Sequence, residues 1–134
     1  MPGERRFRPF FNPPMKRLGL FMAFMALGGA AASAPPQPIP SGRYVFQHRF
    51  AEQPDMRSVA LTAIVEGRHI VLTSAVDTAA FPKGVVAEGT LMWHAGSKQW
   101  IIGNTEADRH AEEVGGCSTG PEVVDLIKRI YWTC

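Results

Sequence analysis

Apolar and polar residues alternate along a short stretch of the chain that begins at Arg43. Such period-two patterning is typical of a β-strand whose two faces meet different surroundings. The pattern predicts a first strand over Arg43–Phe50, which ends before the Pro54-containing stretch Glu52–Asp55. Its two faces carry Tyr44, Phe46, His48 and Phe50 on one side and Val45, Gln47 and Arg49 on the other.

Two further runs, Arg57–Val65 and His69–Val76, flank the turn residues Glu66-Gly67-Arg68 and predict a hairpin. A two-residue turn at 66–67 or at 67–68 gives different registers, but the faces follow from parity and stay the same. One face is expected to carry Val59, Leu61, Ala63, Val65, Ile70, Leu72 and Val76, and the other Ser58, Thr62, His69 and Thr73.

A second hairpin is predicted from Val85–His94 and Gln99–Gly103, with Asp77–Lys83 as the loop that precedes it. A two-residue turn at 96–97 and a four-residue loop at 95–98 give the same pairing. The expected cross-strand pairs are Trp93 with Trp100 and Leu91 with Ile102. An opposed aromatic pair stabilises a hairpin by roughly 0.2–1 kcal/mol relative to an alanine pair.

The C-terminal part of the chain is less regular. Residues 104–120 predict a long polar loop. The final stretch Pro121–Cys134 allows two interpretations, because its apolar positions also fit helical spacing behind a first-turn proline. Its β-branched and aromatic composition favours strand, which we expect. The residues at helical spacing are Val123, Leu126, Ile127 and Ile130.

These elements predict a mainly β fold, a small antiparallel barrel or sandwich of five or more strands, with a short C-terminal helix as the alternative for the last stretch. The strands fall in one domain, residues 42–134. A linker, residues 33–41, precedes it and contains four prolines, which favour extended backbone. The interior of so small a barrel is expected to hold side chains.

Residues 1–32 have the order of a secretory signal peptide. Met15-Lys16-Arg17 is basic, Leu18–Ala32 is apolar, and Met15 is an alternative start to Met1. Cleavage is expected after Ala32, because a cut after Ala34 would place a proline directly behind it. A retained membrane anchor is the alternative, and both interpretations export the C-terminal domain. We therefore expect a periplasmic or secreted protein.

Net charge differs between the two parts of the chain. Residues 1–32 hold five basic residues and one acidic residue, whereas residues 33–134 hold nine Lys or Arg and eleven Asp or Glu. The domain is thus mildly acidic and lacks the basic surface that a phosphate backbone requires. We therefore do not expect the domain to bind nucleic acid.

Two cysteines, Cys117 and Cys134, are expected to form a disulfide in an exported domain. A metal site that combines the two thiolates with His94 or His110 is the alternative, although ligand spacing does not favour it. A nucleophilic Cys117 lacks an identifiable base. The polar loop also gathers Glu106, Asp108, His110, Glu112 and Glu113, without the regular spacing of a calcium loop.

No Gly-x-Ser-x-Gly, His-Glu-x-x-His, Gly-x-Gly-x-x-Gly or P-loop pattern occurs in the chain. The sequence therefore assigns no catalytic residue, metal or cofactor, and it favours a protein that is not an enzyme. Aromatic residues are abundant, and partly exposed tryptophans are typical of binding surfaces. The candidate binding residues are Trp93, His94, Trp100 and Trp132.

Gly42-x-Tyr44 at the start of the first strand, glycine-marked hairpins, and an aromatic terminal strand ending in Cys134 resemble small secreted barrels of lipocalin-like and lysozyme-inhibitor-like type. The resemblance is architectural and carries over no functional residue. It favours an exported, non-catalytic binding module whose partner is a protein or an envelope component, such as a wall-degrading enzyme that it inhibits. The alternatives are a carrier of small hydrophobic ligands and, less favoured, a hydrolase or metal-dependent enzyme that uses residues 104–120.

The order of basic, apolar and small residues at the N-terminus predicts that the exported protein begins at Ser33. Mass spectrometry of the intact purified protein measures this directly. A soluble cytoplasmic protein that retains Met1 or Met15 would contradict the prediction.

Overall fold

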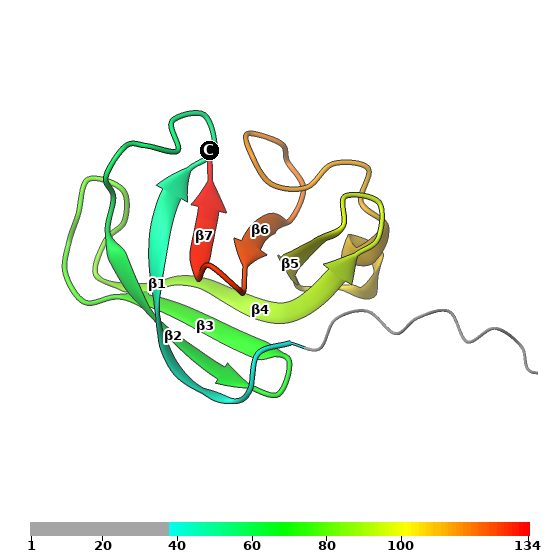
Figure 1. The fold of residues 1–134 in the computed structure, drawn as a ribbon, viewed down its shortest axis with the longest axis horizontal. Coiled ribbons are helices and arrows are strands. Elements are labelled where there is room, and N and C mark those ends of the chain that lie inside the picture. The colour runs from blue at the N-terminus through cyan, green and yellow to red at the C-terminus, as the bar shows by residue number, and fades with distance from the viewer. Residues whose placement is uncertain (1–37) are drawn as a thin grey trace, which may run out of the picture. The chain divides into compact units, whose positions relative to one another are not determined.

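The computed structural model describes residues 38–134, so the predicted signal peptide and most of the proline-rich linker lie outside the described residues. The domain is mainly β, as the sequence predicts, with one short 3-10 helix (Figure 1). The elements are β1 (Gly42–Phe50), β2 (Ala60–Glu66), β3 (His69–Ser74), β4 (Gly84–His94), β5 (Gln99–Gly103), η1 (Glu106–His110), β6 (Glu122–Asp125) and β7 (Ile130–Thr133).

The seven strands form a closed barrel in which each strand pairs with the next along the chain. All these neighbouring pairs are antiparallel, and the barrel closes where β7 pairs with β1. The closing pair is parallel, from Gln47 opposite Ile130 to Phe50 opposite Thr133. An odd number of alternating strands forces this arrangement, because the first and the seventh strand then run in the same direction.

The predicted faces are confirmed within β1 to β3, but Ser58, predicted on the face opposite to the core, lies before β2 and its hydroxyl is hydrogen-bonded to the buried His48. The side chains of the predicted core face are buried or half-buried, and the core cluster includes Phe46, Leu61, Ala63, Val65, Ile70 and Leu72. Val76 also departs from the prediction, because β3 ends at Ser74 and Val76 is 60% exposed. The hydroxyl of Ser74 donates to the carbonyl of Val76, 2.7 Å away, so the chain turns where the sequence predicts two more strand residues.

For each hairpin, the structure contains one of the two turns that the sequence allows. Glu66 pairs with His69, so the first turn is Gly67-Arg68, and Gly67 has a φ of 62° that favours glycine. His94 pairs with Gln99, so the second hairpin has the four-residue loop 95–98. The predicted opposition of Trp93 and Trp100 is confirmed.

The C-terminal stretch forms two strands, β6 and β7, and the helical alternative is wrong. The carboxylate of Asp125 accepts hydrogen bonds from the backbone N–H groups of Ile127 and Lys128, at 2.9 and 2.8 Å. Arg129 then adopts a φ of 56°, which a helix cannot continue. The apolar residues at helical spacing are thus divided between two strands and the turn that joins them.

The polar loop between β5 and β6 is ordered by its own side chains. The carboxylate of Asp108, in η1, accepts hydrogen bonds from the backbone N–H groups of Asn104 and Thr105, at 2.7 and 3.0 Å. These bonds, first that from Thr105, hold the pKa of Asp108 below its usual value. A sequence without helical periodicity therefore still forms a single 3-10 turn.

His48 is buried at the seam where β1 meets β7. Its Nε2 lies 2.7 Å from the hydroxyl oxygen of Thr133, and its Nδ1 is hydrogen-bonded to the hydroxyl of Ser58. The rings of Phe50 and Phe81 meet the imidazole edge to face, with centroids 4.6 and 4.7 Å away. Burial, and secondarily the charge of Arg49, lower the pKa of His48 from its usual 6.5.

This lowered pKa predicts that the domain loses stability as the pH falls below about 6.5. The unfolded chain then binds a proton that the folded state excludes, so the stabilisation is complete above the unfolded pKa and decreases toward the folded one. Thermal unfolding of wild type and His48→Gln at pH 7.5 and 5.5 measures the effect. Lowering the pH from 7.5 to 5.5 should decrease the melting temperature less in His48→Gln than in wild type. The control His110→Gln, which alters an exposed histidine, should show the same decrease as wild type.

Candidate functional site

A groove of about 490 Å³ lies beside the β4–β5 hairpin and the β6–β7 turn. The chain contains three tryptophans, and all three line this groove. Trp93 comes from β4, Trp100 from β5 and Trp132 from β7. The barrel therefore gathers residues that are far apart in the sequence into one aromatic surface, which we call the tryptophan groove.

Two packing clusters hold the three rings in place. Trp93 and Trp100 pack with the barrel core, and their ring centroids lie 5.5 Å apart at an interplanar angle of 67°. Trp132 instead packs against a smaller cluster that includes Ile101 and Val123. This difference follows from strand alternation, because the neighbouring Tyr131 belongs to the barrel core. The tryptophan groove is thus lined by side chains of both clusters.

Polar residues and two isoleucines complete the tryptophan groove. Lys98, Gln99 and Asp125 line it together with Ile39 and Ile127. Ile127 is 94% exposed at the β6–β7 turn. The sequence does not predict this exposure, because Ile127 also fits the helical spacing of buried residues. An apolar groove with a few polar groups at its sides is the usual form of a binding site.

His94, the fourth predicted binding residue, does not line the tryptophan groove. It is buried, and its Nε2 lies 2.8 Å from the carbonyl oxygen of Ala111, an acceptor, so this nitrogen carries the proton. Its Nδ1 then accepts a hydrogen bond from the backbone N–H of Ser97, at 3.1 Å. His94 therefore joins the β4–β5 loop to the polar loop, and both ring nitrogens are occupied.

A second, polar cleft of about 880 Å³ lies between these two loops, and His94, Arg109, His110, Glu112 and Glu113 line it. The Nε of Arg109 lies 2.7 Å from a carboxylate oxygen of Glu106, without the alignment that a hydrogen bond needs. Within residues 38–134, no group of three or more His, Cys, Asp or Glu is placed to hold a metal ion. Burial raises the pKa of Glu122, but this carboxyl group lines neither cleft.

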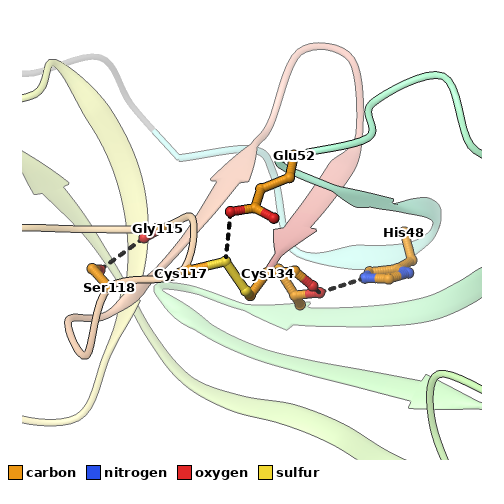
Figure 2. The surroundings of a disulfide bond; sticks show 7 residues. His48, Glu52, Gly115, Cys117, Ser118 and Cys134 are labelled. Atoms are coloured by element: carbon orange, nitrogen blue, oxygen red, sulfur yellow. Dashed lines mark hydrogen bonds between the residues drawn. A yellow bond between two sulfur atoms is a disulfide. The ribbon is translucent and has the colours of Figure 1, made fainter.

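Cys117 and Cys134 form a disulfide, as the sequence predicts, with their Cα atoms 4.5 Å apart (Figure 2). The bond joins the last residue of the chain to the loop that follows Gly115 and Gly116, both of which have positive φ. A carboxylate oxygen of Glu52 lies 3.4 Å from the sulfur of Cys117. Because both sulfurs are in the disulfide, neither is free to bind a metal or to act as a nucleophile.

Comparison of the chain with protein-family models, with curated proteins and with solved structures finds no match. In the part that the structure describes, no helix has the length and apolarity needed to cross a membrane.

We predict that Cys117→Ser lowers the melting temperature by several degrees. Closing a loop of 17 residues stabilises a protein by roughly 3 kcal/mol through chain entropy, and about 1 kcal/mol already shifts a domain of this size by roughly 4–8 °C. Thermal unfolding with and without a reductant measures the shift. An unchanged melting temperature after complete reduction would show that the bond does not contribute.

Proposed function

We propose that this protein is an exported, non-catalytic binding module that recognises a protein or an envelope component through the tryptophan groove. The observation that carries the proposal is that all three tryptophans of the chain line this one groove. Tryptophan is enriched among the residues that dominate binding energy, because its large ring buries much apolar area and loses little conformational freedom.

The exposure of the lining residues supports the same function. Trp93 and Trp132 are half-buried, so the packing clusters fix their positions while part of each ring stays accessible. Ile127 contributes nearly a whole apolar side chain to solvent. Lys98, Gln99 and Asp125 offer donors and acceptors beside it, which could fix the orientation of a partner.

The interior of the barrel supports a binding module over a carrier of small hydrophobic ligands. Phe46, Ile70, Leu72 and Leu91 are fully buried and pack in one core cluster, so side chains occupy this part of the barrel interior. The polar cleft offers little to a hydrolase, because its buried histidine is held by Ser97 and Ala111.

Export is supported by the disulfide, since such bonds persist in oxidising compartments. The architectural resemblance to lysozyme-inhibitor-like barrels suggests one concrete partner, a wall-degrading enzyme that the protein inhibits. The groove is the surface through which such an enzyme would be bound.

The test compares two exposed apolar residues, Ile127 in the groove and Val76 outside it. Immobilised wild type, Ile127→Asp and Val76→Asp are incubated with envelope extract, and the captured component is identified and titrated against each variant. Every tryptophan of the chain lines the groove, so the intrinsic tryptophan fluorescence of the protein reports binding there without a label. Ile127→Asp should bind at least tenfold more weakly, a loss of about 1.4 kcal/mol, while Val76→Asp binds like wild type.

Equal binding by both variants would place the binding surface elsewhere and contradict the proposal. Circular dichroism of each variant checks that the substitution leaves the fold intact. Both side chains lie in turns at the surface, so the barrel core does not depend on either.

A further inference from the structure

The sheet formed by β1 to β4 carries exposed apolar side chains on the side that faces away from the barrel core. Tyr44 and Phe46 pack in the core, so strand alternation points the residues beside them outward. Within residues 38–134, six large apolar side chains are exposed, and three of them lie on this side. They are Val45 on β1, Ile64 on β2 and Val85 on β4. Exposed apolar residues that gather in one patch mark interaction surfaces.

Strand pairing joins these residues into one continuous surface, which we call the outer face. It consists of two rows of four residues, and each row crosses all four strands. Apart from the two ends of the first row, every member is β-branched and offers a methyl group on a stiff side chain. The first row is Arg43, Ile64, Val71 and Glu88. The second row is Val45, Thr62, Thr73 and Val85.

The two charged members of the outer face, Arg43 and Glu88, lie at opposite ends of one row, and both are exposed. Within residues 38–134, Arg43 forms no ion pair, and Glu88 pairs with His69 through one carboxylate oxygen at 3.0 Å. Three strand spacings, about 14 Å, separate the backbones of Arg43 and Glu88, which exceeds the Debye length of about 10 Å at 0.1 M salt. The two charges therefore do not neutralise each other within one molecule.

We propose that a second copy of this chain packs face to face on the outer face, related by a two-fold axis that runs along the strands between β2 and β3. Such an axis reverses the order of the strands and leaves each row opposite itself. Arg43 then meets Glu88 of the second copy, Val45 meets Val85 of the second copy, and each contact occurs twice. Two sheets that pack in this aligned way lie about 10 Å apart.

The charge pattern favours a second copy over an unrelated partner. The same face supplies both members of each ion pair and both sides of each apolar contact, which is the condition for a two-fold symmetric interface. Four strands about 4.8 Å apart make a surface of modest width, so the interface is at the small end of specific interfaces and the dimer is weak.

No residue of the outer face lines the tryptophan groove. The dimer therefore keeps both grooves open. If the proposed function holds, one dimer engages a surface that displays several copies of the partner through two grooves at once, and binding gains from the second contact.

The first test measures self-association by sedimentation velocity, from micromolar to millimolar concentration, on the protein as its host produces it. Wild type should form a dimer that dissociates on dilution. Ile64→Glu should raise the dissociation constant at least tenfold, because the axis places each new charge in the interface twice. The matched control is Met56→Glu, since Met56 is 43% exposed, Ile64 is 44% exposed, and Met56 lies in the loop between β1 and β2. This control should dimerise like wild type.

The second test exchanges the charges at the ends of the first row, at low ionic strength. Arg43→Glu and Glu88→Arg each place like charges opposite one another in the dimer, so each should weaken association several-fold. The double variant Arg43→Glu/Glu88→Arg should regain most of the wild-type affinity. This recovery reports a contact between two copies, because the two positions lie too far apart to interact within one.

A protein that stays monomeric at millimolar concentration would overturn the inference. A dimer that Ile64→Glu leaves intact would also overturn it. If Ile127→Asp weakens the dimer in place of Ile64→Glu, the second copy occupies the tryptophan groove and the outer face is not the interface. Circular dichroism checks the fold of each variant, and the charge exchange still decides the question if Ile64→Glu does not fold. None of these measurements uses a partner of the groove, so the proposed function stands or fails separately.

Discussion

The parallel pairing of β1 with β7 is the contact on which the barrel depends. It joins the first strand of the barrel to the last, and without it the sheet would keep two open edges. Because so short a pairing orders few residues, it needs reinforcement by side chains. Inside the barrel, the hydrogen bond between His48 and Thr133 reinforces the pairing. At the end of β7, the disulfide holds the last residue in place, as Figure 2 shows.

The tryptophan groove depends on this same closure. Trp132 comes from β7, and it meets Trp93 and Trp100 in one groove only when β7 is held in place between β1 and β6. The backbone N–H of Ala51 also donates to the carbonyl of Thr133 at 2.8 Å, which extends the closure past the last strand residue. A site made of residues from β4, β5 and β7 thus exists only in the closed fold.

The sequence predicts those features that depend on local pattern. Parity alone places Phe46 and Leu61 in the core, and the short loop after His94 sets Trp93 against Trp100. It does not predict features that depend on closure or on a single side chain. The bond from Ser74 that ends β3 and the turn at Asp125 have no periodic signal, and nothing local reveals that Ile39 meets Trp132 in one groove.

The parallel direction of the first and last strands also has a mechanical consequence. The chain enters β1 at one end of the barrel and leaves β7 at the other, as Figure 1 shows for the C-terminus beside the tip of β1. A pulling force between these points acts along the strands and loads the β1–β7 hydrogen bonds together, in shear. The disulfide diverts part of that load from Cys134 to Cys117, so tension on the C-terminus reaches the polar loop as well as the closing strands.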